Sequence, residues 1–229
     1  MLTPEEEEEL HLSMVRGAVE LGHRRLVFKP HPSAPAAWSR RLEVEAGRLG
    51  ADLTVLDSPV IAEVVYQRLR PALVVGCFST ALLTATVFYG LPVARTGTDL
   101  LLERLTPYQN SNRVPVTLVD ALLPQLTDGQ AVDSWSLPER DEVRRELTDL
   151  VAAVGFAMQP QIYPELRPRA ERYLSAHLTQ HTWRYFRRKR LTRLGLPGAV
   201  PSQLAFVPQS PAVRRMARRA RSLKRKFAS

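Results

Sequence analysis

The sequence predicts an α/β protein with a Rossmann-like, doubly wound parallel sheet, followed by a helical and strongly basic extension. Between residues 25 and 126, short apolar runs alternate with amphipathic stretches, and the connections are short. This rhythm is typical of βαβ units. Beyond residue 126 the alternation stops and positive charge accumulates. We therefore expect two domains, residues 1–126 and residues 127–229.

The elements of the first part follow from local signals. Thr3, Pro4 and Glu6 form an N-cap, a first helical position and a capping box, so a helix begins near residue 4 and ends at Gly22. The run 72–77 is apolar on both faces, as expected of a central parallel strand. Strands are expected at residues 26–28, 53–56, 72–77 and 92–94. Helices are expected at residues 36–49, 58–69, 79–88, 98–105 and 116–123.

The second part is expected to be helical. Residues 106–113 form a polar stretch that we interpret as a surface loop without a role, and residues 128–136 resemble a linker. A helix of about twenty residues opens at Leu137-Pro138-Glu139, and another is expected over residues 164–193. Residues 197–211 are rich in proline and should interrupt regular structure.

Charge and cysteine content bound the class of protein. Residues 159–229 hold 17 Lys/Arg against two acidic residues, a net charge of +15, whereas residues 1–158 carry −6. The single cysteine, Cys77, excludes an intramolecular disulfide and suits a reducing compartment. The acidic run 5–9 is unlike a signal peptide, and no apolar stretch is long enough to span a bilayer. We expect a cytoplasmic protein.

One candidate site follows the first strand. Lys29-Pro30-His31-Pro32 places an imidazole in a turn that two prolines restrict. At the carboxyl end of a strand, His31 can donate a hydrogen bond to a phosphate or protonate a phosphate leaving group, and Lys29 adds positive charge. An isolated His-Pro pair is more often an ordinary proline-flanked loop.

A second candidate site lies where the run 72–77 gives way to a helix. Ser79 and Thr80 stand at the helix start, where unpaired backbone N–H groups, two hydroxyls and the helix dipole favour an anion. Simple N-capping by Ser79 is the alternative. Ligands of doubly wound sheets bind at the carboxyl ends of strands, so both candidate sites belong to the same edge.

Taken together, the two motifs resemble a known family. The order Lys-Pro-His-Pro, then Pro-x-x-x-Glu, then Gly-x-x-Ser-Thr is similar to the donor-binding domain of bacterial sialyltransferases, most closely the alpha-2,8-polysialyltransferase-like proteins, over about residues 1–126. The resemblance implies the C-terminal half of a GT-B fold and a CMP-sialic acid donor. It implies that His31, with Pro32, contacts the CMP phosphate and assists its departure.

The same resemblance assigns further residues. It implies that Ser79 and Thr80 hold the phosphate, that Glu63 contacts the ribose hydroxyls, and that Lys29 has a lesser part in donor binding. Glu63 could equally be a solvated helix carboxylate. The resemblance implies no cofactor beyond the CMP-sugar substrate, and no residue cluster requires a metal.

One departure from the family pattern bears on activity. The family uses an acidic general base in an Asp/Glu-Asp/Glu-Gly motif, and this sequence contains none. We therefore expect the donor-binding half of a (poly)sialyltransferase for a cell-surface glycan, truncated or split from an acceptor domain on another polypeptide. The alternatives are a non-catalytic nucleotide-sugar-binding remnant and a related transferase that uses CDP-glycerol.

The basic extension suggests a polyanionic partner. Trp183, Tyr185 and Phe186 precede the basic run 187–190. Further along, an apolar helical stripe is surrounded by Arg and Lys; it comprises Val213, Met216, Ala220, Leu223 and Phe227. This pattern predicts peripheral binding to the inner, anionic membrane face. Nucleic acid is the less favoured partner, and a solvated tail is the simplest alternative.

Overall fold

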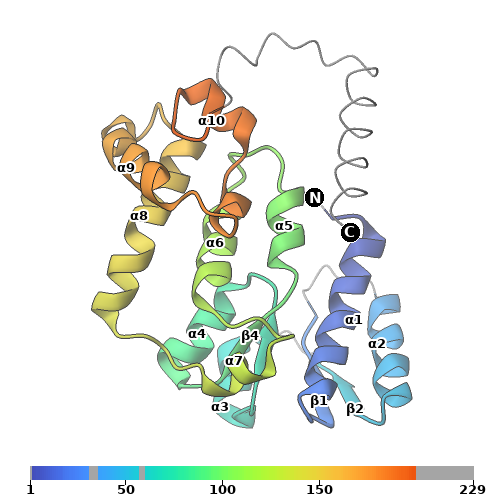
Figure 1. Cartoon of the computed structure of the whole chain (residues 1–229). Coiled ribbons are helices and arrows are strands. Elements are labelled where there is room, and N and C mark those ends of the chain that lie inside the picture. The colour runs from blue at the N-terminus through green and yellow to red at the C-terminus, as the bar shows by residue number, and fades with distance from the viewer. Residues whose placement is uncertain (1, 31–35, 57–59, 200–229) are drawn as a thin grey trace, which may run out of the picture.

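The computed structural model describes residues 2–30, 36–56 and 60–199 and confirms the α/β class (Figure 1). The described strands form two separate two-stranded sheets, β1–β2 and β3–β4, and both pairs are parallel. The continuous doubly wound sheet expected from the sequence is therefore not seen in the described part of the chain. We refer to each strand pair, together with the helices packed on it, as a layer; the two layers differ in how deeply their strands are buried.

The first layer is covered by helices on one face only. It comprises α1 (Pro4–Glu20), β1 (Arg25–Phe28), α2 (Ala36–Arg48) and β2 (Asp52–Val55). Leu26, Phe28 and Leu53 pack against residues of α1 and α2, whereas Arg25 and Val27 are exposed. A strand with alternating burial of this kind needs only one covering layer, because its side chains alternate between the two faces.

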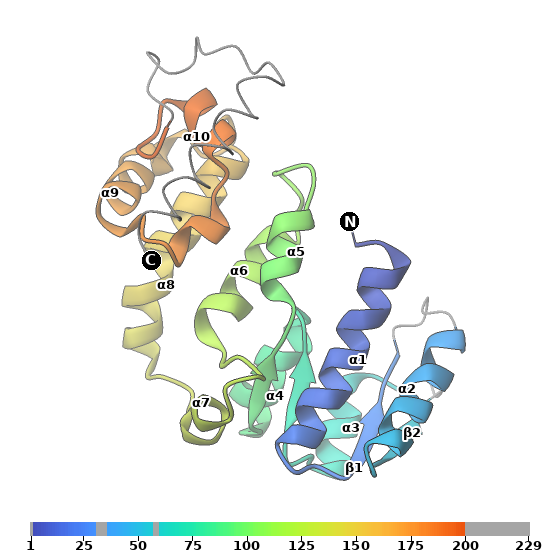
Figure 2. The same ribbon diagram turned by 45° about the vertical axis from the view of Figure 1, so that its right-hand side comes forward.

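Helix α1 begins with the capping box that the sequence predicts. The Thr3 hydroxyl accepts a hydrogen bond from the Glu6 N–H at 3.2 Å, and the Glu6 carboxylate accepts one from the Thr3 N–H at 3.0 Å. Further along, a Cβ added at Gly17 would lie 2.5 Å from Leu126 Cδ2. Helix α1 therefore packs closely against the second layer as well as the first (Figure 2).

The second layer is more deeply buried. It comprises α3 (Ala62–Leu69), β3 (Val74–Gly76), α4 (Thr80–Tyr89) and β4 (Val93–Arg95). All three residues of β4 are buried, whereas those of β3 are half-buried. The sequence favoured β3 as the central strand; β4 is the more buried because it pairs with β3 and also bridges Gln125 through Arg95.

The remaining elements are helical. They are α5 (Thr98–Arg104), α6 (Arg113–Leu122), α7 (Gly129–Ser134), α8 (Arg140–Met158), α9 (Arg167–His177), α10 (Arg188–Leu194) and the 3₁₀ helices η1 (Pro164–Leu166) and η2 (Thr182–Tyr185). Helix α7 lies where the sequence suggested a linker; the Asp128 carboxylate caps it by accepting from the Ala131 N–H at 3.0 Å. Helices α8 to α10 gather on the side of the molecule away from α2 (Figure 1).

The long helix expected over residues 164–193 is wrong, because the chain breaks twice within it. At the first break, the Thr182 hydroxyl accepts from the Thr179 N–H at 2.9 Å, and the Thr179 hydroxyl accepts from the Thr182 N–H at 3.3 Å. Threonine hydroxyls compete in this way with helical hydrogen bonds. The two threonines therefore form a turn between α9 and η2.

The largest core cluster joins α5, α6, α8, α9 and α10, and it also contains Leu10 of α1 and Cys77. It includes residues on both sides of position 126, the domain boundary expected from the sequence, and that division stays a prediction. In the part of the chain described, no helix combines the length and hydropathy needed to cross a membrane.

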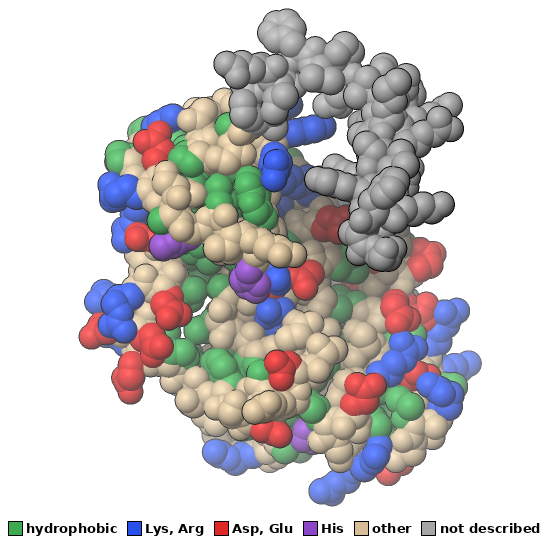
Figure 3. All heavy atoms as spheres, in the orientation of Figure 1, with side chains coloured by type: hydrophobic (Ala, Val, Ile, Leu, Met, Phe, Trp, Pro, Cys, Tyr) green, Lys and Arg blue, Asp and Glu red, His purple; other side chains and the backbone are tan. Residues whose placement is uncertain are grey.

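Ion pairs cover the surface over α1 and α2, where Lys/Arg and Asp/Glu side chains are interspersed (Figure 3). Arg16 contacts Glu45 at 2.6 Å and so links α1 to α2. Arg48 and Arg16 together lower the pKa of Glu45 to about 2. Arg104 contacts Glu6 at 2.8 Å and links α5 to α1. These exposed pairs orient neighbouring helices, and each contributes little to stability.

Candidate functional site

The turn between β3 and α4 carries the two hydroxyls singled out in the sequence. Strand β3 ends at Gly76, Cys77 is buried, and Ser79 and Thr80 are exposed at the start of α4. The Ser79 oxygen accepts a hydrogen bond from the Ala81 N–H at 3.2 Å, so Ser79 is the N-cap. A serine hydroxyl that accepts one bond still has a proton to donate. Capping therefore leaves Ser79 able to bind an anion beside Thr80.

Gly76 allows the turn to start close to α4. A Cβ added there would lie 3.3 Å from Leu82 Cδ1, inside the usual contact range. Leu82 is 1% exposed and belongs to the core between α3, α4 and β4. The small residue at position 76 thus lets the first turn of α4 pack onto the end of β3.

Glu63 lies in the first turn of α3, next to the start of α4. Tyr66, one turn along α3, donates a hydrogen bond from its hydroxyl to the Ala81 carbonyl at 3.3 Å. Burial and, to a lesser extent, the nearby charge of Glu63 together raise the pKa of Tyr66 to about 12. The helix that carries Glu63 therefore packs against the start of the helix that carries Ser79 and Thr80. Glu63 itself is half-buried.

The other half of the predicted site follows β1. Lys29 is half-buried directly after this strand. His31 and Pro32 lie outside the described residues. In the described part of the chain, neither a hydrogen bond nor an ion pair joins Lys29 to Glu63, Ser79 or Thr80. Glu63, Ser79 and Thr80 thus lie on the neighbouring helices α3 and α4, and Lys29 follows β1.

A histidine that sequence reasoning missed lies near the end of β1. The His11 ring of α1 meets the Phe28 ring edge-on, with centroids 5.5 Å apart. Burial lowers the pKa of His11, and the nearby Glu7 partly opposes that shift. A lone histidine in an acidic helical segment has no motif, so only the fold reveals that it adjoins the strand leading to His31.

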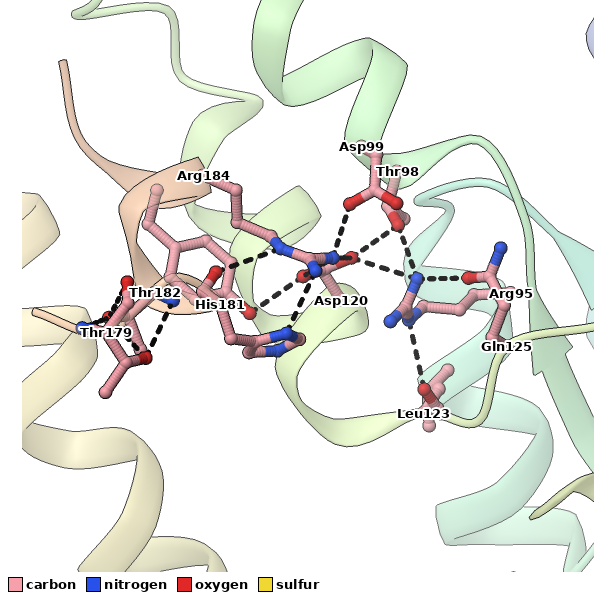
Figure 4. Close-up of polar contacts among 11 residues, drawn as sticks. Arg95, Thr98, Asp99, Asp120, Leu123, Gln125, Thr179, His181, Thr182 and Arg184 are labelled. Carbon is pink, nitrogen blue, oxygen red and sulfur yellow. Dashed lines mark hydrogen bonds and ion pairs between the residues drawn. The ribbon is translucent and has the colours of Figure 1, made fainter. Parts of the chain in front are cut away.

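A second polar cluster that the sequence did not reveal lies beyond the end of β4 (Figure 4). Arg95 forms an ion pair with Asp120 of α6 at 2.9 Å, and the two side chains are 8% and 0% exposed. Thr98, Arg184 and Tyr185 complete the hydrogen bonds of the Asp120 carboxylate. These residues are scattered through the sequence, and no spacing rule connects them.

Most residues of the polar loop 106–113 that we assigned to the surface are exposed, but two of them are part of the core. Tyr108 is buried, and Arg113 is 1% exposed. The Arg113 guanidinium lies 4.1 Å from the centroid of the Tyr108 ring and donates to the carbonyls of Tyr108 and Leu105 at 2.9 and 3.0 Å. Burial lowers the pKa of Arg113. The loop therefore has a structural role, contrary to our expectation.

The aromatic and basic residues 183–190 also serve the fold. Tyr185 and Phe186 are buried. Arg187 donates to the carbonyls of Glu103 and Leu105, and Arg190 donates to those at the end of α8. The aromatic residues of this pattern therefore belong partly to the core and two of its arginines bond to backbone carbonyls, whereas Arg188 and Lys189 are exposed. The apolar stripe 213–227 lies outside the described residues.

Comparisons with known proteins agree with the motifs. The structure defines an α/β protein with a hydroxyl-bearing turn at the carboxyl end of a parallel strand. The family model of alpha-2,8-polysialyltransferase (POLYST) matches residues 1–98, which confirms the resemblance over that segment. The match associates the segment with sialyltransferase activity in general, and hence with a nucleotide-sugar donor and a glycan acceptor. Neither the curated proteins nor the solved structures gave a match.

Proposed function

We propose that the chain is the donor-binding half of a GT-B sialyltransferase that uses CMP-sialic acid and elongates a cell-surface glycan. The family match over residues 1–98 supports the class of donor. The main structural support is the exposed pair Ser79 and Thr80 at the start of α4, with Glu63 on the adjacent helix. Hydroxyls at a helix N-terminus suit a phosphate, and a carboxylate suits ribose hydroxyls.

The proposed chemistry is an inverting displacement. An acceptor hydroxyl attacks the anomeric carbon of sialic acid while the bond from that carbon to the CMP phosphate oxygen breaks. Ser79 and Thr80 stabilise the charge on the departing phosphate, Glu63 holds the ribose, and His31 donates a proton to the leaving group. Lys29 adds positive charge to the donor site. The acceptor proton passes to an acidic base outside these 229 residues, because they lack the Asp/Glu-Asp/Glu-Gly motif.

Titration calorimetry with CMP, CDP and UDP tests the donor class. We expect a clear preference for CMP. The double variant Ser79→Ala/Thr80→Ala should weaken CMP binding about tenfold or more, since each lost bond to a charged group is worth ~1.5–3 kcal/mol. His31→Ala should weaken it similarly. Thr84→Ala, one turn further along α4, is the matched control. A preference for CDP would instead favour the CDP-glycerol class.

The role of Glu63 has its own test. Glu63→Gln should reduce the affinity for CMP but leave that for 2′,3′-dideoxy-CMP unchanged, because only the former offers ribose hydroxyls. Gln67→Ala, one turn along α3, controls for general changes in the helix. Equal losses for both nucleotides would remove Glu63 from the site.

The purified chain should transfer little or no sialic acid to oligosialic acid, because the general base is missing. Donor hydrolysis would persist weakly. Transfer at a rate typical of enzymes would show that a base lies within these residues. Binding of CMP without transfer, even after addition of candidate acceptor domains, would favour the non-catalytic alternative.

The basic end of the chain belongs to the same proposal. Residues 211–229 carry eight Lys/Arg and no acidic residue, and an apolar stripe runs through them. Such a segment would hold the donor site near anionic lipid on the cytoplasmic face, where lipid-linked acceptors are made accessible. This placement is a proposal from the sequence pattern.

A further inference from the structure

The Asp120 carboxylate is the centre of a closed polar network (Figure 4). Its Oδ1 accepts from the Thr98 hydroxyl at 2.6 Å and lies 2.9 Å from Arg95 Nη1. Its Oδ2 accepts from the Tyr185 hydroxyl at 2.7 Å. Arg184 reaches both oxygens at 3.3 Å and also pairs with Asp99. Two carboxylates thus face two guanidinium groups, and the charges balance.

One side of this network holds the ends of β3 and β4. Arg95 is the last residue of β4 and pairs with Gly76, the last residue of β3. The Thr96 N–H donates to the Gly76 carbonyl at 3.0 Å. Arg95 also donates from Nε to the Leu123 carbonyl at 3.0 Å. The position of Gly76, three residues before Ser79, therefore depends on a strand end that the Arg95–Asp120 pair anchors.

The other side of the network belongs to the C-terminal segment, which we define as residues 178–196. Tyr185 and Arg184 come from this segment, and Tyr185 is 1% exposed. Its carbonyl accepts from the Tyr108 hydroxyl at 2.9 Å, which fixes η2 against the core. The segment thus contacts Asp120 through two side chains while its backbone is held independently.

We propose that Asp120 is a positioning residue through which the C-terminal segment controls the turn at residues 77–80. The ligand part of this proposal rests on the proposed CMP site. Docking of Tyr185 and Arg184 onto Asp120 keeps Arg95 and the ends of β3 and β4 in place, and the Ser79 and Thr80 hydroxyls keep their geometry. Release of the segment loosens the turn and weakens phosphate binding. The helical part of the chain is then a regulatory element of the donor site.

Cys77 is a native reporter of this coupling. It is the only cysteine of the chain, it is 8% exposed, and it occupies the turn itself. Burial raises the pKa of its thiol to about 12; Arg95 opposes that shift, and Asp120 adds to it. At pH 8 the thiol of the folded protein should therefore react with an aromatic disulfide reagent only when the turn opens.

The test compares two substitutions in the C-terminal segment. Tyr185→Phe removes the bond to Asp120 and keeps the ring in the core. Arg190→Met removes bonds from the same segment to the Ala157 and Met158 carbonyls at the end of α8, away from β4. We expect Tyr185→Phe to raise the Cys77 reaction rate about tenfold and to weaken CMP binding several-fold. At matched global stability, Arg190→Met should change neither.

The outcomes separate the coupling from the proposed function. An unchanged thiol rate in Tyr185→Phe, or equal changes in both variants, would overturn the coupling. If the wild-type chain does not bind CMP while Tyr185→Phe still raises the thiol rate selectively, the proposed function fails and the coupling stands. Arg184→Met, which removes the contacts of Nη1 to Asp99 and Asp120, provides a second variant should Tyr185→Phe fold poorly.

Discussion

The two layers of the molecule differ in how far their ion pairs are exposed to solvent. Around β1 and β2 the ion pairs are exposed; in the pair Arg16–Glu9 the side chains are 38% and 63% exposed. Beyond β4 the side chains of the pair Arg95–Asp120 are 8% and 0% exposed, and both make further hydrogen bonds. Water screens the first kind, whereas the second stands in a low-dielectric interior. We therefore expect the buried ion pair to contribute more to the stability of this fold than the exposed ones.

The largest expected effect comes from breaking the hidden pair. Asp120→Asn keeps the side-chain shape but leaves Arg95 without its carboxylate and Arg184 with Asp99 alone. We expect a loss of about 3–5 kcal/mol in the free energy of unfolding, measured by urea denaturation. Glu9→Gln in the exposed pair should cost less than about 1 kcal/mol. Similar losses in the two variants would contradict the claim that the buried pair contributes more to stability than the exposed one.

Two glycines compare packing in the two layers. Gly97 and Gly50 both have a left-handed backbone, with φ of +74° and +71°. A Cβ at Gly97 would lie 2.1 Å from Leu10 Cδ1, whereas one at Gly50 would meet open space. Gly97→Ala should therefore cost about 2–4 kcal/mol, from strain and overpacking together.

Gly50→Ala should cost only the backbone strain, about 1–2 kcal/mol. The urea midpoints of the two variants, measured at equal slope, check the difference. If Gly50→Ala proved as costly as Gly97→Ala, the close contact of Leu10 with Gly97 would add nothing to the cost of the substitution.

The pH dependence of stability sharpens the comparison further. Burial, the charge of Asp120 and the bond to it raise the pKa of Tyr185 above its ordinary value of 10. A folded pKa above the unfolded one gives stability that is complete below about pH 10 and is lost as the pH rises toward the folded value. Unfolding free energies between pH 8 and 11 should fall, and Tyr185→Phe should fall less steeply. Tyr163→Phe, at an exposed position, should follow wild type.

The last predictions concern the basic residues beyond α9. Arg187 donates to the carbonyls of Glu103 and Leu105 at 2.7 and 2.9 Å, so Arg187→Ala should cost about 1–3 kcal/mol of stability without changing vesicle binding. Deletion of residues 211–229 should do the reverse: it should lower sedimentation with anionic vesicles and leave stability and CMP affinity unchanged. Each basic group near such a surface contributes ~1 kcal/mol, which salt screens.

Apolar insertion should add a part that salt does not remove. Replacing Leu223 and Phe227 with Ser should lower the binding that remains at high salt. Equal sedimentation of wild type and truncation, or preferential retention on duplex DNA at physiological salt, would replace the membrane proposal with its nucleic-acid alternative.

Several elements could be predicted because their signals are local. The capping box at Thr3 and Glu6 and the N-cap at Ser79 depend on residues a few positions apart. The glycine at position 90 ends α4 with a left-handed backbone, as its sequence position indicates. The motif Gly-x-x-Ser-Thr is equally local, and it led to the family that matches residues 1–98. The roles assigned to His31, Glu63, Ser79 and Thr80 stay predictions.

The sequence by itself determined the α/β class, most element positions up to α6 and the family resemblance of the first 98 residues, because hydrophobic period, caps and motifs are short-range properties. Only the tertiary structure determined the burial and hydrogen bonding of Tyr108, Arg113 and Asp120, and of the arginines at 184, 187 and 190. Apart from Asp120, which stands in an expected helix, these residues stand in stretches whose composition is that of a solvated loop and a basic tail. They are buried or hydrogen-bonded because their partners, which are carboxylates, helix ends and carbonyls, are distant in sequence but close in the folded chain. A local sequence pattern cannot predict such contacts.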